Sequence, residues 1–235
     1  MFRDSELTTA VTCEYAFSED GFEIRRAVLG AGEMDAIRAE VSLDHAILRR
    51  TGVRNLEKKF DSIAKVAQQA SVLSIAETLL GGAPRLVRAL FFDKTPERNW
   101  FVTWHQDRTV TLNRRADLEG WGSWTFKDGV HHVQPPRAVL DRMVTIRLHI
   151  DPANLSTGCL RVVPGSHRYG ILNAEEIASV VVRSAPLACI ADPGDAVVMH
   201  PLILHSSAKS RLDAHRRIVH LEFSNYDLPP GIAWA

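Results

Sequence analysis

The spacing of hydrophobic and polar positions changes about one third of the way along the chain, near Pro84. Before that point, apolar residues recur at helical spacing from about Glu33 to Leu48 and again over roughly 62–80. The second stretch ends in the glycine pair at 81–82, a common helix stop. A turn and a short strand over residues 20–29 are expected before the first helix.

After Pro84 the chain is dominated by short apolar or alternating runs, which predict β-strands. The strands are expected over 85–92, 102–107, 143–150, 159–163, 196–199 and 217–223. One helix is expected over about 174–181, where Asn173 and Glu176 form a plausible capping pair. Helices followed by many short strands predict a mainly β (α+β) fold. We expect a cupin-like jelly roll buttressed by N-terminal helices.

Residues 108–142 are expected to form a long loop, which in a compact domain is usually functional and often lines an active site. Within it, His131 and His132 are candidate substrate-binding residues. Two tryptophans, Trp121 and Trp124, could contact a ligand or could instead pin the loop to the core by aromatic packing.

Length and composition favour one domain, because 235 residues with 46% hydrophobic content can bury a single substantial core. We expect residues 1–235 to form one domain, with a helical part over about 30–82 and a jelly-roll core over about 85–225. Lys plus Arg and Asp plus Glu both number 28, so the formal charge is zero. This balance gives no indication of nucleic acid or an anionic membrane as partner. The oligomeric state is not indicated.

We expect a cytoplasmic protein, because the sequence shows no targeting signal that we recognise and its cysteines lack the spacing of metal or redox sites. The first residues are polar and lack the apolar core of a signal peptide, and no apolar run approaches the ~18 residues of a membrane helix. Cys13, Cys159 and Cys189 are odd in number and lack metal-binding or redox spacing. Such cysteines are typical of buried thiols in a reducing compartment.

The most specific chemical feature is the sequence Trp-His-Gln-Asp at 104–107. In an extended strand, positions i and i+2 face the same side, so His105 and Asp107 can offer an imidazole and a carboxylate to one metal ion. A distal histidine would complete two imidazoles and one carboxylate. That ligand set is typical of non-haem Fe(II) oxygenases.

Two other pairs have the same spacing. His220-Leu-Glu222 lacks any later histidine in the sequence to serve as the distal ligand. His149-Ile-Asp151 is only about fifty residues from a distal histidine and leads directly into an Asp-Pro turn. We therefore prefer His105 and Asp107.

His200 and His205 compete as the distal ligand, and Pro201 breaks the strand between them. We choose His205 because Arg216 follows it by eleven residues and supplies a cation suited to a dicarboxylate co-substrate. We expect His149, His200 and His220 to be core residues, since a lone histidine on an apolar strand is more often a satisfied core residue than a ligand.

The chain resembles the phytanoyl-CoA dioxygenase family of Fe(II)/2-oxoglutarate-dependent oxygenases. The resemblance rests on the early Gly-Phe-x-Ile-Arg-Arg segment, on Trp-His-Gln-Asp, on Gly-Cys-Leu-Arg-Val-Val-Pro-Gly-Ser-His at 158–167, and on the segment from Gly194-Asp195 through His205 to Arg216. The ordered combination is far more specific than a bare His-x-Asp. We expect His167, the last residue of the 158–167 segment, to have a structural role.

The resemblance implies a double-stranded β-helix with Fe(II) on His105, Asp107 and His205. It also implies that Arg216 pairs with the distal carboxylate of 2-oxoglutarate and that Ser207 hydrogen-bonds the same co-substrate. For Trp121 and Trp124 it suggests further co-substrate contacts. Asp107 favours hydroxylation, since related halogenating enzymes replace that carboxylate with a small residue.

The expected function is that of an Fe(II)- and 2-oxoglutarate-dependent dioxygenase that hydroxylates an unidentified small molecule with O2, releasing succinate and CO2. Two alternatives stay open. One is a non-catalytic jelly-roll protein that binds a small molecule. The other is a cupin-like enzyme that uses a different divalent metal, which the His-x-Asp and distal His set would also suit.

Overall fold

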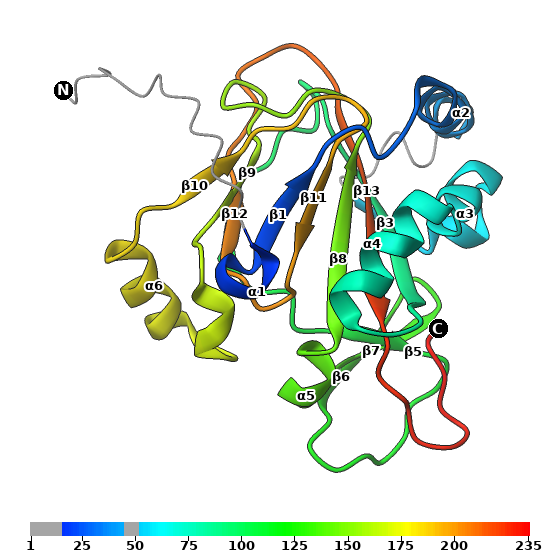
Figure 1. Ribbon diagram of the computed structural model, residues 1–235, viewed down its shortest axis with the longest axis vertical. Helices are drawn as coiled ribbons and strands as arrows, with labels where there is room; N and C mark the ends of the chain where they lie inside the picture. Colours follow the sequence, from blue (N-terminus) through cyan, green and yellow to red (C-terminus); the bar gives the residue numbers. More distant parts are fainter. Residues whose placement is uncertain (1–15, 45–51) are drawn as a thin grey trace.

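Two antiparallel sheets face each other and form the body of the protein (Figure 1), whose computed structural model describes residues 16–44 and 52–235. The larger sheet has six strands, in the order β1 (Phe22–Arg25), β11 (Ala196–Met199), β8 (Met143–His149), β13 (Arg216–Ser224), β3 (Arg85–Lys94) and β2 (Gly52–Arg54). The smaller sheet has four, in the order β10 (Leu187–Cys189), β9 (Leu160–Val162), β12 (His205–Ser207) and β4 (Val102–His105). This arrangement confirms the expected jelly roll.

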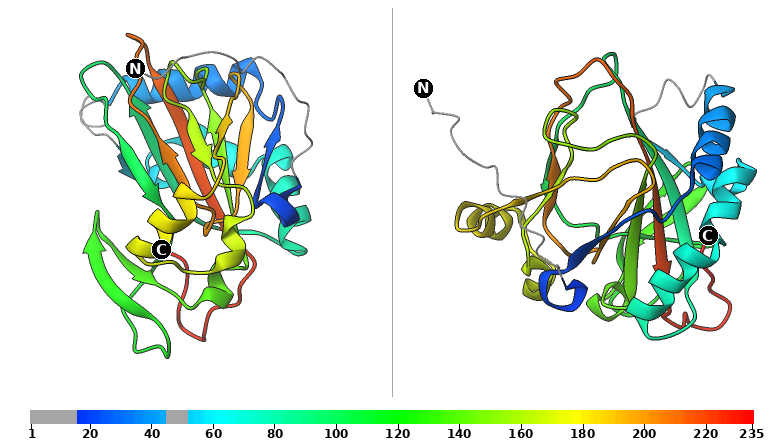
Figure 2. Two further views of the ribbon diagram at one scale, coloured as in Figure 1. Left: turned by 90° about the vertical axis from the view of Figure 1, so that its left-hand side faces the viewer. Right: turned by 45° about the horizontal axis from the view of Figure 1, so that its top comes forward.

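Helices cover the outer face of the larger sheet, as Figures 1 and 2 show. They are α2 (Ala31–Ser42), α3 (Asp61–Ala67) and α4 (Ala70–Leu80), and the short 3-10 helix η2 (Leu56–Lys58) directly precedes α3. Their apolar faces pack on outward side chains of the central strands, among them Ile146, Leu148 and Val219. The single helix expected over 62–80 is in fact two, because the chain leaves the helical conformation at Gln68. The predicted stop is confirmed at Gly81, which adopts a left-handed conformation with φ 66°.

The prediction of a long loop over residues 108–142 is wrong. The segment contains a third, three-stranded sheet made of β5 (Val110–Leu112), β7 (Val130–Gln134) and β6 (Gly122–Lys127), followed by the short helix α5 (Arg137–Leu140). This sheet lies at one end of the sandwich (Figure 1). Its strand β6 is largely exposed on both faces, so it lacks the alternation that would have marked it as a strand.

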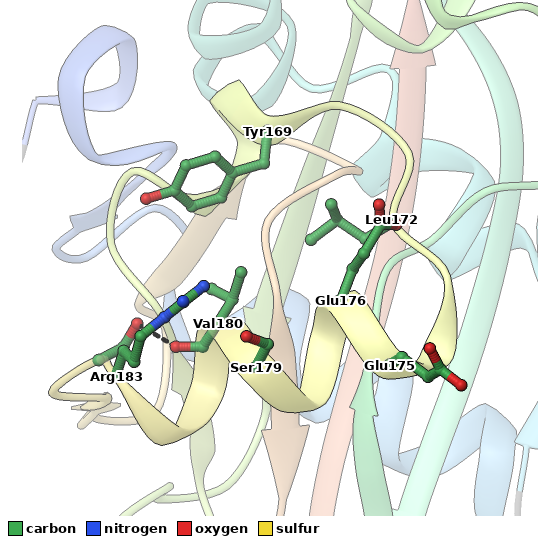
Figure 3. A pocket seen from close by; sticks show the side chains of 8 residues that line it. Tyr169, Leu172, Glu175, Glu176, Ser179, Val180 and Arg183 are labelled. Atoms are coloured by element: carbon green, nitrogen blue, oxygen red, sulfur yellow. Dashed lines mark hydrogen bonds between the residues drawn. The ribbon is translucent and has the colours of Figure 1, made fainter.

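On the side of the sandwich away from α2, α3 and α4, the helix α6 (Ala174–Val182) packs against the outer face of the smaller sheet near Trp104 (Figure 1). The predicted capping pair is confirmed, since the Asn173 side chain accepts from the backbone N–H of Glu176 and the Glu176 side chain accepts from that of Asn173. A shallow groove of about 590 Å³ runs along α6, where Tyr169 faces the helix (Figure 3). The remaining short helices are α1 (Phe17–Asp20) and η3 (Ser166–Tyr169).

Two glycines occupy positions where a side chain would clash with neighbouring atoms. Gly21 has φ 76°, and a Cβ there would lie 2.3 Å from Nδ1 of His167. A Cβ on Gly158 would lie 2.3 Å from the carbonyl oxygen of Ala208, just after β12. His167 also packs on the ring of His200, with 5.1 Å between the ring centres.

The first long helix was expected to reach Leu48, but α2 ends at Ser42 and Leu43 is its C-cap. Residues 45–48 of that prediction, and Cys13, lie outside the described residues. Within the described part of the chain, no helix is long and apolar enough to cross a membrane.

Candidate functional site

The Trp-His-Gln-Asp segment leaves β4 with its side chains in alternation, so that His105 and Asp107 share one side. The amide group of Gln106 points the other way and makes three buried hydrogen bonds, to the backbone of Gly170, Leu172 and Leu202. The backbone N–H of Asp107 donates to the carbonyl of Pro201 at 2.9 Å. These bonds fix the two candidate ligands in space.

His205 arrives from β12, the neighbouring strand, where it is the register partner of His105. The two imidazole rings lie 4.1 Å apart, centre to centre. Nε2 of His105 is 3.8 Å from one carboxylate oxygen of Asp107, and Nε2 of His205 is 3.6 Å from the other. A single divalent ion can bridge such distances, since its bonds to imidazole and carboxylate are about 2.0–2.2 Å long.

The hydrogen bonds of the two imidazoles select the form that binds a metal. Nδ1 of His105 lies 2.8 Å from the carbonyl oxygen of Thr103, and Nδ1 of His205 lies 2.9 Å from that of Ile203. A carbonyl only accepts, so each Nδ1 must carry the proton and each Nε2 keeps its lone pair. Oδ2 of Asp107 is buried without a hydrogen-bond partner among the described residues. This donor set fits a divalent metal.

The charges of Asp107 and His205 also suit metal binding. Burial alone would raise the pKa of Asp107, but the nearby His205, His220 and His105 hold that pKa well below its usual range. Burial also lowers the pKa of His205, to about 4, against the opposing effect of the Asp107 carboxylate. Asp107 is therefore ionised and His205 neutral at neutral pH, which are the forms that ligate metals.

The triad opens into a cavity of about 250 Å³ between the two sheets. Its walls are formed by Phe92, Trp100, Val102, His105, Asp107, Arg147, Leu160, His205, Ser206, Ser207, Arg216 and His220. The predicted residues Arg216 and Ser207 are therefore brought to the same cavity as the triad.

Arg216 is 2% exposed, and its Nε and Nη1 have no hydrogen-bond partner within the described part of the chain. Burial and the neighbouring Arg147 lower its pKa to about 10, which leaves it charged. A buried guanidinium with free donors is suited to an incoming carboxylate.

Lys94 also lies beside the site, although the sequence pattern did not predict it as a site residue. It is fully buried opposite Arg216 in the strand register, and its Nζ donates to the Ser207 hydroxyl at 2.6 Å and to the carbonyl of Ala208. Burial, with Arg216 and Arg147 nearby, lowers the pKa of Lys94 to about 7. Its sequence signal is a lysine at the inward-facing end of an apolar strand.

His220, Glu222 and Asp107 form a second group of metal-ligating side chains, but its hydrogen bonds argue against a second ion. Nη1 of Arg147 lies 2.7 Å from Nδ1 of His220, and a guanidinium can only donate. Nε2 of His220 must then carry the proton, and it donates to Glu222 at 3.1 Å. Neither nitrogen of His220 keeps a free lone pair. His220 was expected in the core, and it is buried but also lines the cavity.

Neither residue of the other rejected pair, His149 and Asp151, lines the cavity of the triad. Asp151 accepts three hydrogen bonds from Arg217, at 2.7–2.9 Å. His149 is fully buried, as expected for a core residue. His200 accepts from the backbone N–H of Leu202.

The four aromatic residues predicted from the 108–142 segment do not line the cavity: Trp124, His131 and His132 lie on the third sheet, and Trp121 directly precedes its strand β6. Trp121 and Trp124 pack on the apolar cluster beneath it, which is the packing alternative. His131 contacts the rings of Trp124 and Phe126, and His132 is buried in β7. The tryptophan that lines the cavity is Trp100.

Comparison with known proteins finds relatives in sequence and in fold. The dioxygenase LolE1 of Epichloe uncinata is 27% identical over 139 residues, which make up 50% of this chain and 54% of that protein. The matched region thus spans about half of that relative.

Two solved structures share the fold. AviO1 from Streptomyces viridochromogenes Tue57 superposes with a TM-score of 0.67 at 21% identity, covering 91% of this chain and 94% of that one. The epimerase SnoN, in complex with Fe3+, alpha ketoglutarate and nogalamycin RO, has a TM-score of 0.67 at 17% identity, covering 93% and 82%. At these identities the likeness establishes the double-stranded β-helix fold. The sequence model of the phytanoyl-CoA dioxygenase family, PhyH, matches residues 17–218, and the chain belongs to this family.

Proposed function

We propose that the protein is an Fe(II)- and 2-oxoglutarate-dependent oxygenase that hydroxylates a small molecule. One observation supports this above all. His105, Asp107 and His205 converge, with Nε2 of both histidines directed at the carboxylate, in a cavity that also holds the buried guanidinium of Arg216, whose Nε and Nη1 have no hydrogen-bond partner among the described residues. A metal triad alone would suit several divalent ions. The buried Arg216 can pair with a carboxylate, so it favours a dicarboxylate co-substrate.

The residues of the cavity have distinct tasks in this proposal. His105, Asp107 and His205 hold the metal, and Arg216 and Ser207, with Lys94 behind it, hold the distal carboxylate of the co-substrate. When bound, Fe(II) and 2-oxoglutarate supply the oxidising chemistry, in which O2 and the co-substrate yield succinate, CO2 and an oxidised C–H bond. The protein positions that bond and excludes water.

Access for the small-molecule substrate is proposed beside β4, the edge strand of the smaller sheet. The His105 side chain is 37% exposed there, and Trp100 and Val102 line the same part of the cavity. We also propose the cytoplasm as location, because Cys159 and Cys189 are both buried free thiols.

The test is an anaerobic titration of the metal-free protein with Fe(II) and then 2-oxoglutarate, followed by visible absorbance. We expect a weak charge-transfer band when the co-substrate chelates the iron. Replacing Arg216 by Gln should weaken 2-oxoglutarate binding by about tenfold to a hundredfold and leave iron affinity unchanged. The exposed Arg211, replaced in the same way, is the matched control.

Two results would contradict the proposal. If iron binds but no band forms at saturating 2-oxoglutarate, the co-substrate is wrong, and a cupin-like enzyme with another metal or a binding protein becomes the better hypothesis. If Asp107→Ala binds iron as tightly as the wild type, the triad is wrong.

A further inference from the structure

Arg147 is a second buried guanidinium in the cavity, and the metal triad and Arg216 leave it without a task. It lies on β8, whose residues alternate between the two faces of the larger sheet. Ile146 and Leu148 pack outward against the helices. Arg147 therefore points between the sheets, where it is 6% exposed and lines the cavity.

A chain of hydrogen bonds holds this guanidinium in one orientation. Arg147 donates to His220, its register partner on β13, and His220 donates to Glu222. Glu222 also accepts from Arg88 at 2.8 Å. The Arg147 guanidinium lies 5.6 Å from the ring centre of Phe92. Its position is thus set before any ligand binds, as a recognition residue requires.

The charges around Arg147 do not balance without a further anion. The Glu222 carboxylate is already engaged by Arg88 and His220, and Asp107 belongs to the metal triad. Nε of Arg147 is buried without a hydrogen-bond partner in the described ranges. A buried cation with an unused donor is costly unless an anion pairs with it. A purely structural arginine would be expected to have its own carboxylate.

We propose that Arg147 binds a carboxylate in the cavity, namely the one next to the keto group of 2-oxoglutarate. The inference rests on the proposed function. Along β13, His220 lies four residues from Arg216, or about 13 Å at ~3.3 Å per residue. Arg147, opposite His220, and Arg216 therefore approach the cavity from different ends. One five-carbon dicarboxylate offers a group to each.

A carboxylate on the substrate is the other source of the same chemistry, and the position of Arg147 argues against it. The proposed entrance lies beside β4 in the smaller sheet, at Trp100 and Val102. Arg147 belongs to the facing sheet, in its interior strand β8. A ligand that reaches it must lie inside the cavity, on the far side from the entrance.

Two 2-oxo acids separate the roles of the arginines. 2-Oxoglutarate carries both carboxylates, whereas 2-oxopentanoate has the same chain length but lacks the distal one. Each acid is titrated anaerobically into the Fe(II)-loaded wild type, Arg216→Gln and Arg147→Gln, and dissociation constants are taken from the absorbance change. Arg216→Gln should weaken 2-oxoglutarate binding and leave 2-oxopentanoate binding nearly unchanged. Arg147→Gln should weaken both acids by the same factor, about tenfold or more.

The outcomes discriminate between the hypotheses. If Arg147→Gln binds both acids as the wild type does, the proposal is overturned, and a substrate carboxylate becomes the better partner. If the iron-loaded wild type binds neither acid, the proposed function itself fails. Iron affinity and thermal unfolding of each variant verify the fold. Should Arg147→Gln not fold, Arg147→Lys tests the same point, because it keeps the charge but cannot reproduce the planar fork. It too should weaken both acids equally.

Discussion

Lys94 and Arg216, register partners on neighbouring strands, place two cations at one end of the cavity. The Lys94 ammonium has been largely removed from water, and its pKa falls to about 7 because of burial and the two nearby arginines. Its charge therefore changes over the pH range in which the protein would work, whereas Arg216, with a pKa of about 10, stays charged.

This difference predicts a pH dependence of co-substrate binding. Protonated Lys94 attracts the 2-oxoglutarate dianion, so affinity should fall as pH rises from about 6 to 8. The bound dianion should raise the pKa of Lys94, so that binding takes up a proton near pH 7.5. Calorimetric titrations of the Fe(II)-loaded protein in buffers of different ionisation enthalpy measure that uptake.

Lys94→Met should bind more weakly and lose both the pH dependence and the proton uptake. The exposed Lys209, replaced by Met, is the matched control and should change neither. Proton uptake that persists in Lys94→Met would assign the titration to another group.

The residues of the site differ in how readily they can be predicted from sequence. His105 ends β4 and Asp107 follows it by two residues, so the alternation expected of a strand was enough to predict that they lie together. Arg147, His220 and Lys94 meet only because β8, β13 and β3 pair in a particular register. That register depends on long-range packing, which has no short-range signal.

At the scale of elements, α6 shows how far local rules reach. The Asn173 side chain accepts from the backbone N–H groups of Glu175 and Glu176, both at 3.0 Å, so it satisfies two donors at the start of the helix. α6 has no fully buried residue in the structure. Its stability should therefore depend more than usual on this cap.

We predict that Asn173→Ala lowers the free energy of unfolding by about 1 kcal/mol. Asn173→Ser, which keeps a side-chain acceptor, should recover most of that loss. Urea unfolding followed by circular dichroism gives both values. Equal stability of Asn173→Ala and the wild type would show that α6 is held by its packing near Trp104 rather than by its cap.

The elements that the sequence did not reveal are those whose own apolar pattern is weak or misleading. The strands β3, β8 and β13 carry apolar residues on at least one face and were predicted. β6 has five exposed residues out of six and exists because it pairs with β7. Residues 62–80 look like one helix by periodicity, yet the chain leaves the helical conformation at Gln68, and α3 and α4 each pack apolar residues on the sheet.

At the scale of the whole molecule, the interior between the sheets is unusually polar for a buried space. Six buried polar side chains lie there on the three neighbouring strands β3, β8 and β13: Arg88, Arg147, His149, Arg216, His220 and Glu222. Such an interior lowers stability relative to an apolar core, which proteins tolerate where a site requires it. The free energy of unfolding should therefore fall at acid pH, because histidines that are buried and neutral in the folded state resist protonation there.

His149 gives the clearest case. It is fully buried, and burial with Arg147 and Arg216 nearby lowers its pKa to about 3. In the unfolded chain its pKa is about 6.5. Between these values the unfolded state binds one more proton than the folded state. Its contribution to stability is therefore complete above pH 6.5 and is lost progressively as pH falls toward 3.

We predict that this one site contributes a slope approaching 1.4 kcal/mol per pH unit between about pH 6 and 4. His149→Leu has no protonatable group and loses no hydrogen bond to the described residues, so its stability should fall less steeply with acid. Urea unfolding of metal-free wild type and variant at several pH values compares the two slopes. The difference should approach one proton. If the two curves run parallel, His149 is protonated or solvated in the folded state, and the space between the sheets admits more water than its burial indicates.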